Sequence, residues 1–295
     1  EPGLDKKIYG ASVDVGTTTI AASLCDLSTG EILSHASGLN PQIKYGDDVL
    51  SRISYCGMNE KGLEEMNDLI IQEINRLIQE MITSISVKEA YIYDIVLVFN
   101  TVMHHITLNI DPEYLGQSPF SSVVTDELNI KARELGIKIC EGAYVYAPPI
   151  EAGFVGADNV SVLISEEPYK QDKMLLIIDI GTNGEIDFGN SKMLLSTSCA
   201  TGPAFEGAQI KYGMRAASGA IEKVKIDKIS LEPDFKIIGE DCWYSKSRTK
   251  MAKGICGSGI IDVVAEMYKS GIIRTDGTFN KKTGSKRIRK DDQGK

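Results

Sequence analysis

Two segments of this chain repeat the same order of residues, and this repeat constrains the fold more than any other feature. Each segment has an apolar strand, then Asp, a variable residue, Gly, Thr, a small polar residue and a second strand. The first copy, ASVDVGTTTIAASLCD, covers residues 11–26, and the second, LLIIDIGTNGEIDFG, covers residues 175–189. Asp14 and Asp179 are equivalent positions about 165 residues apart. A repeat of that length has the size of a domain, so it predicts two related domains rather than a solenoid.

The turn between the paired strands is suited to binding an anion. Glycine lacks a Cβ, so it can adopt a positive φ and lets the backbone lie close to a ligand. Successive N–H groups in such a turn converge on an anion, and hydroxyl and amide side chains add donors. The residues predicted to bind phosphate are Gly16, Thr17, Thr18, Gly181, Thr182, Asn183 and Gly184.

The two aspartates require a cation, because a carboxylate beside a phosphate repels it. Mg²⁺ prefers carboxylate oxygens together with water and phosphate oxygens. Asp14 and Asp179 are therefore predicted to be catalytic and to position a hydrated Mg²⁺. The chain has no GxxxxGK[ST] motif, so Mg²⁺ rather than a lysine of that motif must neutralise most of the charge. Asp158 is a third catalytic candidate that can orient a water as base; the alternative is a solvated or helix-capping role.

Charge and composition exclude several classes of function. The 295 residues carry a formal charge of −9, which argues against nucleic acid as the main partner. No apolar run reaches the ~18 residues of a membrane span, and the polar first residues predict no signal peptide. The six cysteines form no CxxC pair and no zinc or iron–sulfur spacing. We therefore expect a cytoplasmic protein with free thiols.

Periodicity predicts alternating strands and helices. The strongest helical pattern is Leu63–Ile85, where apolar residues recur at steps of three and four. A shorter helix is expected within residues 46–55, with Asp47 or Asp48 near its N-cap. Other helices are predicted over residues 151–164 and from the glycine-rich segment at residue 254 to Gly271. Strands are predicted over residues 8–15, 19–27, 32–36, 94–100, 144–149, 174–180, 185–188 and 192–196.

Several further residues are weaker candidates for the site. Gly202 and Glu206 follow a strand end and are predicted to contact phosphate or adenosine; the alternative is a turn that packs the next helix. Gly257 and Gly259 precede a helix whose N-terminus can face an anion, although the spacing alone is weakly specific. Asn100 and Thr101 end a buried strand near the expected cleft; the alternative, a structural role, is favoured for them. His104 and His105 are expected on an extended segment, where neighbours point to opposite faces and chelate a metal poorly; the expected role is structural. 

The repeated turns resemble the two phosphate loops of the ASKHA superfamily, which includes actin, sugar kinases, acetate kinases and seventy-kilodalton heat-shock chaperones. DVGTTT is similar to the first loop, DIGTNGE to the second, and EAGFVGAD lies where that superfamily has a connecting helix. The resemblance implies an α/β fold of two duplicated ribonuclease-H-like lobes, with mixed sheets and helices and nucleotide in a cleft. The expected lobes are residues 1–170 and residues 171–295.

A more specific resemblance is to the reductive activators of corrinoid proteins. The strings that carry it are GDDVLSRI, FNTVMHHITLNIDP, DIGTNGE, TGPAFEGAQIKYGMRAASGAIE and GICGSGIIDVVAEMYKSGII. Together they extend from Tyr9 to about Phe279. The resemblance implies an ATPase with ATP and Mg²⁺ as cofactors. It implies a corrinoid protein of a methyltransferase system as partner, whose cobalt is reduced from Co(II) to Co(I).

The chain departs from that family in two places. The activators resemble fusions with an iron–sulfur domain, whereas no cluster-binding cysteine pattern occurs here. We therefore expect the ATPase part of a longer protein, with the cluster in a domain absent from this chain and the electron donor unassigned. The adenosine loop of the superfamily, similar to AGGFG, is also missing, so the second lobe is expected to be incomplete.

Three rival functions remain open at this point. A small-molecule kinase of the same fold would require a carboxylate base beside a substrate pocket, and no such motif is apparent. An ATP-coupled activator of a radical dehydratase is disfavoured by the long GPAFEG string. A non-catalytic scaffold would bind nucleotide only to change partners. A homodimer is compatible with each of these readings.

Overall fold

The computed structural model describes residues 8–181, 183–207, 210–214, 216–247, 252–283 and 287–288. These residues divide into two compact units. Unit 1 comprises the residues up to Asp179 and residues 185–198, and unit 2 comprises residues 180–184 and those from residue 199 onward. The predicted lobe boundary at residue 170 stays a prediction, and each unit is described by itself.

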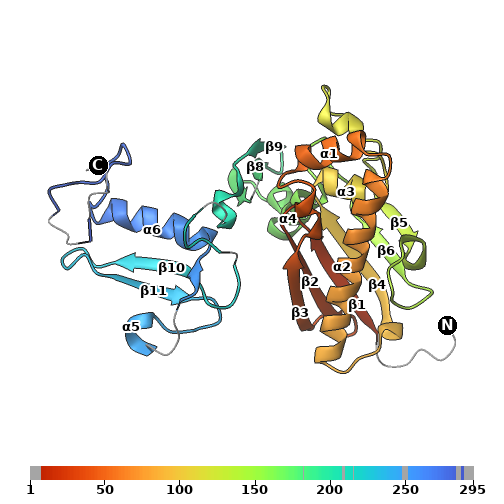
Figure 1. Ribbon diagram of the computed structural model, residues 1–295, viewed down its shortest axis with the longest axis horizontal. Helices are drawn as coiled ribbons and strands as arrows, with labels where there is room; N and C mark the ends of the chain where they lie inside the picture. The colour runs from red at the N-terminus through yellow and green to blue at the C-terminus, as the bar shows by residue number, and fades with distance from the viewer. Residues whose placement is uncertain are drawn as a thin grey trace. The chain divides into compact units, whose positions relative to one another are not determined.

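A six-stranded sheet forms the centre of unit 1 (Figure 1). Its strand order is β3-β2-β1-β4-β6-β5. Neighbours β1–β2, β2–β3 and β5–β6 are antiparallel, whereas β1–β4 and β4–β6 are parallel. The strands are β1 (Tyr9–Val15), β2 (Thr19–Asp26), β3 (Ile32–Leu39), β4 (Ile92–Phe99), β5 (Leu128–Lys131) and β6 (Tyr144–Ala147).

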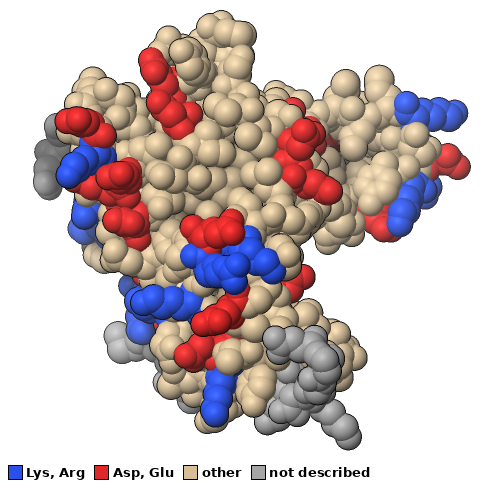
Figure 2. All heavy atoms as spheres, turned by 90° about the vertical axis from the view of Figure 1, so that its right-hand side faces the viewer, with Lys and Arg blue, Asp and Glu red and all other residues tan. Residues whose placement is uncertain are grey.

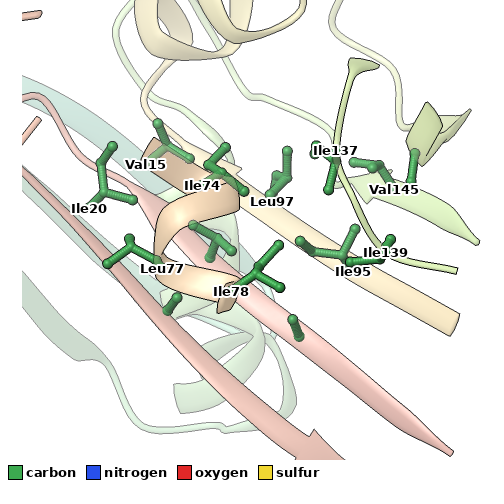
Figure 3. Packing of buried hydrophobic residues seen from close by; sticks show 14 of the residues in the cluster. Val15, Ile20, Ile74, Leu77, Ile78, Ile95, Leu97, Ile137, Ile139 and Val145 are labelled. Atoms are coloured by element: carbon green, nitrogen blue, oxygen red, sulfur yellow. The ribbon is translucent and has the colours of Figure 1, made fainter. Parts of the chain in front are cut away.

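The long helix α2 (Gly62–Ser84) supplies much of the core of unit 1. It runs along one face of the sheet and contacts β2 and β3 (Figure 1). Ile74, Leu77 and Ile78 are at most 1% exposed and point toward the strands (Figure 3). The three- and four-residue steps place these side chains on a single helix face, which confirms the prediction for Leu63–Ile85.

The other helices of unit 1 are short. Helix α1 (Val49–Met58) has Asp48 as N-cap, whose Oδ1 accepts from the Ser51 N–H at 2.7 Å, as the sequence predicted. The remaining helices are α3 (Thr101–Thr107), α4 (Ala157–Glu166) and the 3₁₀ turns η1 (Pro41–Lys44), η2 (Glu89–Tyr91), η3 (Glu113–Gly116), η4 (Ala132–Leu135) and η5 (Pro168–Lys170).

Two local predictions were wrong. His104 and His105 lie on α3 and not on an extended segment, because the Asn100 side chain accepts from the Met103 N–H at 3.0 Å and starts a helix. The helix predicted from residue 151 begins only at Ala157. Its N-cap is Gly156, where a Cβ would collide with the Phe99 carbonyl oxygen, so the chain can approach β4 only with glycine there.

The second copy of the repeat forms a three-stranded sheet in the order β7-β8-β9. Its strands are β7 (Leu175–Ile180), β8 (Asn183–Asn190) and β9 (Met193–Ala200). These match the predicted strands, and their succession repeats that of β1, β2 and β3. Glu185 and Asp187 lie on the same buried face of β8 because side chains alternate along a strand.

Unit 2 contains a small sheet and a helix. The sheet order is β11-β10-β12, and α6 (Gly257–Lys269) packs on β10 (Figure 1). The predicted stop at Gly271 is confirmed, since this glycine has a φ of +72° directly after the C-cap. The other elements are β10 (Ala220–Ile226), β11 (Pro233–Ile237), β12 (Gly254–Ile255), η6 (Pro203–Glu206) and α5 (Tyr244–Ser247).

Candidate functional site

The first loop, residues 14–18, joins β1 to β2 and has its carbonyl groups held by buried side chains and backbone. The Gly16 carbonyl accepts from Asn40 Nδ2 at 2.8 Å, and the Thr18 carbonyl accepts from the Asn40 N–H at 2.9 Å. The Thr17 carbonyl accepts from Arg52 Nη2. Asn40 and Arg52 are both 0% exposed, so these three successive carbonyls point into the protein.

The direction of these carbonyls fixes the direction of the amides. In a trans peptide the C=O and the following N–H point in opposite directions. The N–H groups of Thr17, Thr18 and Thr19 are therefore directed away from Asn40 and Arg52. Successive amides oriented in this way are the arrangement expected of an anion nest.

Gly16 does not use the positive φ that glycine permits. Its φ lies outside the left-handed region that favours glycine. A side chain is disfavoured for another reason, because a Cβ would lie 2.6 Å from the Thr19 carbonyl oxygen. The glycine at this position thus permits a tight turn rather than an unusual dihedral angle.

Asn100 reaches the same loop from the end of β4. Its Nδ2 donates to Thr17 Oγ1 at 3.0 Å, while its Oδ1 caps α3. Thr17 is only 6% exposed, and its hydroxyl is occupied by Asn100. The neighbouring Thr101 is structural in its contacts, since its hydroxyl donates to the Ala152 carbonyl at 2.6 Å.

Carboxylates of unit 1 gather beside the first loop. Burial, with repulsion from Asp158 and Asp179, raises the pKa of Asp14 to about 7, although solvent still reaches this side chain. Burial also raises the pKa of Asp158 to about 6, with repulsion from Asp179 acting against a backbone hydrogen bond from Asn159. The structure thus brings the three predicted catalytic aspartates within electrostatic reach of one another.

Glu185 is a member of this group that the sequence did not identify. It is 9% exposed, and its Oε1 accepts from Ser198 Oγ at 2.9 Å. Burial raises its pKa to about 7 against that hydrogen bond, and Asp158 and Asp179 add repulsion. A signal was present, because Glu185 ends the string DIGTNGE, three positions after the second DxGT motif.

A buried amide–carboxylate pair lies next to this group in the sequence. Asn159 Nδ2 donates to Asp187 Oδ1 at 3.0 Å, and both residues are 1% exposed. The other oxygens, Asn159 Oδ1 and Asp187 Oδ2, have no hydrogen-bond partner among the described residues. The pair links α4 to β8, which are the elements that carry Asp158 and Glu185.

The second loop, residues 179–184, is described except for Thr182, which lies outside the described residues. The Gly181 carbonyl accepts from Thr201 Oγ1, and the Gly181 N–H donates to the Asn183 carbonyl at 2.9 Å. The Gly184 carbonyl accepts from Cys199 Sγ at 3.4 Å. Carbonyls of the second loop thus also accept from neighbouring side chains. Unlike the amides of the first loop, however, the Gly181 N–H donates to a carbonyl of its own loop.

The glycines predicted near the second loop have packing contacts or open surroundings. A Cβ at Gly257 would collide with the Phe205 carbonyl oxygen, and one at Gly259 would collide with the Ile221 carbonyl oxygen. Gly202 has a φ of +82° with open space around it. The side chain of Glu206 lies outside the described part of the chain. Contacts of these residues with nucleotide stay predictions.

The described residues offer no preformed set of direct metal ligands. Within them, no group of three or more His, Cys, Asp or Glu side chains is arranged to hold a metal ion. The raised pKa values of Asp14 and Asp158 nevertheless fit a divalent cation held partly through water, because the positive charge would stabilise their ionised forms. Oxygen donors of this kind are those that Mg²⁺ prefers, and its binding here stays a prediction.

Two features of the protein bear on nucleic acid and membranes as partners, namely its surface charge and the length and polarity of its helices. On the face in Figure 2, Lys and Arg side chains of the described residues lie beside Asp and Glu side chains. In the ranges that the structure describes, no helix is both long and apolar enough to cross a bilayer.

Comparisons with known proteins identify related sequences over nearly the whole chain. A sequence model described as the RACo middle region matches residues 9–171. A second, described as the C-terminal domain of RACo, the ASKHA domain, matches residues 173–295. The chain is 36% identical over 277 residues to a corrinoid activation enzyme, RamQ, of Eubacterium limosum, covering 94% of this chain and 44% of that protein.

Two further relatives agree with these matches. A reductase of Methanosarcina barkeri for a Co(II) methylated amine-specific corrinoid protein is 26% identical over 289 residues, covering 90% of this chain and 52% of that protein. A solved reductive activator for corrinoid,iron-sulfur protein superposes with a TM-score of 0.88 and 35% identity, covering 99% of this chain and 45% of that chain. The chain spans about half the length of these relatives, and the structural match confirms the predicted α/β fold.

Proposed function

Since the chain belongs to the RACo family, we propose that it is the ATPase portion of a reductive activator of a corrinoid protein. ATP binding and hydrolysis would drive the reduction of Co(II) to Co(I) in a corrinoid protein of a methyltransferase system. The relatives support the partner class, because they are named as a corrinoid activation enzyme and a reductase of a corrinoid protein.

The single observation that carries the ATPase proposal is the first loop. Its inward carbonyls orient the following amides as an anion nest, and acidic side chains of raised pKa gather beside it. A phosphate chain bound with a divalent cation matches both parts, because the amides meet phosphate oxygens and the carboxylates meet the cation.

The residues take separate roles in this proposal. The amides of the first loop bind phosphate, and Asp14 and Asp179 orient the waters around Mg²⁺, which when bound stabilises negative charge on the phosphoryl group. Asp158, with a pKa of about 6, accepts a proton from the attacking water. Gly181, Thr182, Asn183 and Gly184 contribute a second set of phosphate contacts.

Nucleotide binding would act on cobalt through a change of conformation. Moving an equilibrium from 1:99 to 99:1 requires about 5.5 kcal/mol of differential binding, which a set of charged hydrogen bonds made in one state can supply. The favoured state would bind the corrinoid protein so that one electron reaches Co(II) and yields Co(I). The electron would come from an iron–sulfur domain outside these residues or from an external low-potential reductant.

The test combines the full-length protein, MgATP, a low-potential reductant and candidate corrinoid proteins, with the Co(I) absorption band as readout. We expect ATP-dependent formation of Co(I). Asp14→Asn and Asp179→Asn should each lower ATP turnover about 10²-fold or more, whereas Asp68→Asn, an exposed acid on α2, should not. Cobalt reduction at the same rate without ATP would show that reduction is not coupled to ATP. Full ATP turnover in both variants would refute the catalytic roles of Asp14 and Asp179.

A further inference from the structure

Arg52 carries a buried positive charge directly beneath the first loop. It lies on α1 and is 0% exposed. Its Nε donates to the Gly46 carbonyl at 3.2 Å, its Nη1 to Gln42 Oε1 at 3.0 Å, and its Nη2 to the Thr17 carbonyl. Nη1 also lies 3.2 Å from Met103 Sδ. Within the described residues this guanidinium forms no ion pair with a carboxylate.

This charge persists at neutral pH. Burial lowers the pKa of Arg52 to about 10, and the nearby Asp48 and Asp47 act in the opposite direction. Burying a charge without an ion-pair partner is costly, so an arginine used only to satisfy carbonyls would be an expensive choice. The position of the charge therefore calls for an explanation beyond packing.

The partner of Nη2 provides that explanation. The Thr17 carbonyl and the Thr18 N–H belong to one peptide group and point in opposite directions. A charge on the carbonyl side polarises the peptide and strengthens the N–H as a donor on the other side. The effect of Arg52 is thus delivered to the outward side of the loop, although the arginine itself does not reach that side.

Arg52 is also held in place from below. Gln42, which is 0% exposed, accepts from Arg52 and donates through Nε2 to the Met66 carbonyl on α2 at 2.9 Å. Asn40 Oδ1 accepts from the Gln42 N–H at 3.0 Å and, through Nδ2, the same side chain holds the Gly16 carbonyl. One connected set of hydrogen bonds therefore runs from α2 to the first loop.

We propose that Arg52 is a positioning residue that provides, through the peptide between Thr17 and Thr18, positive charge for a phosphate bound at the first loop. The proposal rests on the proposed nucleotide-binding function. Asp14 and Asp158 surround the loop with negative charge, and the chain has no GxxxxGK[ST] lysine. Arg52 is a positive charge on the inward side of this loop and is bonded to the Thr17 carbonyl.

The test measures binding to the full-length protein by calorimetry with MgATP, magnesium tripolyphosphate and adenosine as probes. Arg52→Met removes the charge and Arg52→Lys retains it. Arg52→Met leaves the Thr18 N–H an ordinary rather than a strengthened donor, a difference of about 1.4 kcal/mol, which predicts about 10-fold weaker binding of MgATP and tripolyphosphate with adenosine binding unchanged. Arg52→Lys should bind MgATP more tightly than Arg52→Met.

Asn67→Ala is the matched control for lost stability. Asn67 Nδ2 donates to the Ile106 and Thr107 carbonyls at 3.1 and 2.8 Å, so the variant loses part-buried hydrogen bonds without touching the first loop. It should unfold at lower urea concentration yet bind MgATP as the wild type does. Equal weakening of MgATP binding in Asn67→Ala and Arg52→Met would overturn the proposal, as would equal loss of adenosine binding in Arg52→Met.

A measurement on the wild type covers the case in which Arg52→Met does not fold. In protein with ¹⁵N-labelled arginine, the Arg52 guanidinium gives a nuclear magnetic resonance signal that is assigned by its loss in Arg52→Lys. MgATP and tripolyphosphate should shift this signal, whereas adenosine should not. An unshifted signal under saturating MgATP would refute the role of Arg52 alone. Failure of the wild type to bind either phosphate probe would instead refute the nucleotide-binding function, and this inference with it.

Discussion

Replacing Glu185 with Gln should make the protein more stable at alkaline pH and leave its stability at acid pH almost unchanged. Glu185 is 9% exposed, and burial with repulsion from Asp158 and Asp179 raises its pKa from 4.5 to about 7. The native state therefore binds the Glu185 proton more tightly than the unfolded state does. Stability from this group is fully present below pH 4.5 and is lost as pH rises toward 7.

The size of the effect follows from that change in pKa. Each tenfold change in proton affinity corresponds to 1.36 kcal/mol, so ionised Glu185 lowers the free energy of unfolding by about 3 kcal/mol above pH 7. Glutamine has nearly the same shape and no charge, and its amide oxygen can accept from Ser198 Oγ as the carboxylate does. The variant should therefore lose the penalty while keeping the contact.

The assay is urea unfolding of the wild type and Glu185→Gln at pH 5 and pH 8, without nucleotide or divalent cations. The free energies of unfolding should differ little at pH 5, and the variant should be more stable by about 3 kcal/mol at pH 8. Glu89→Gln, at an exposed position, should follow the wild type at both pH values. A Glu185→Gln difference that is the same at pH 5 and pH 8 would refute the reasoning.

Three further perturbations test the hydrophobic core, the close approach of Gly156 to β4, and the binding of Mg²⁺. Leu77→Ala, at a side chain that is 0% exposed, should lower the free energy of unfolding by about 2–5 kcal/mol in urea, and a loss below 1 kcal/mol would contradict its place in the core. Gly156→Ala should cost about 1–3 kcal/mol because its Cβ meets the Phe99 carbonyl, whereas Gly142→Ala, with open space around it, should cost little; equal costs would be inconsistent with the tight approach. Mg²⁺ should raise the thermal midpoint more at pH 8 than at pH 5, because the carboxylates beside the first loop are then ionised, and a shift independent of pH in scanning fluorimetry would count against cation binding there.

Much of the fold was predictable because its signals are local. Apolar periodicity located α2, and the DxGT motif between apolar segments located both copies of the repeat. The short helix α3 was missed because it spans only Thr101–Thr107 and follows a buried strand, so its apolar residues read as extended chain. The early start predicted for α4 ignored the close approach of Gly156 to β4, which depends on residues far away in the sequence.

In the candidate site, too, the sequence identified residues that carry a local motif and missed residues whose contacts lie far away in the sequence. The sequence identified Asp14, Asp158 and Asp179, and the structure brings their charges within reach of one another. It did not identify the residues that support the loop, because Arg52 and Asn40 meet their carbonyl partners 35 and 24 positions away. A faint signal existed, since Arg52 falls on the buried side of α1 with Val49 and Ile53, where a charged residue is unusual.

The two kinds of charge around the first loop have a joint consequence. Arg52 places positive charge inside the protein without an ion-pair partner, and Asp14, Asp158 and Glu185 hold negative charge only at the cost of raised pKa values. Neither set can neutralise the other at short range, because no ion pair joins Arg52 to a carboxylate in the described residues. A phosphate with a divalent cation supplies both missing signs at once, so each component should bind more tightly when the other is present. Binding of this kind stabilises one conformation strongly, which is the property that a nucleotide-driven activator of a corrinoid protein requires.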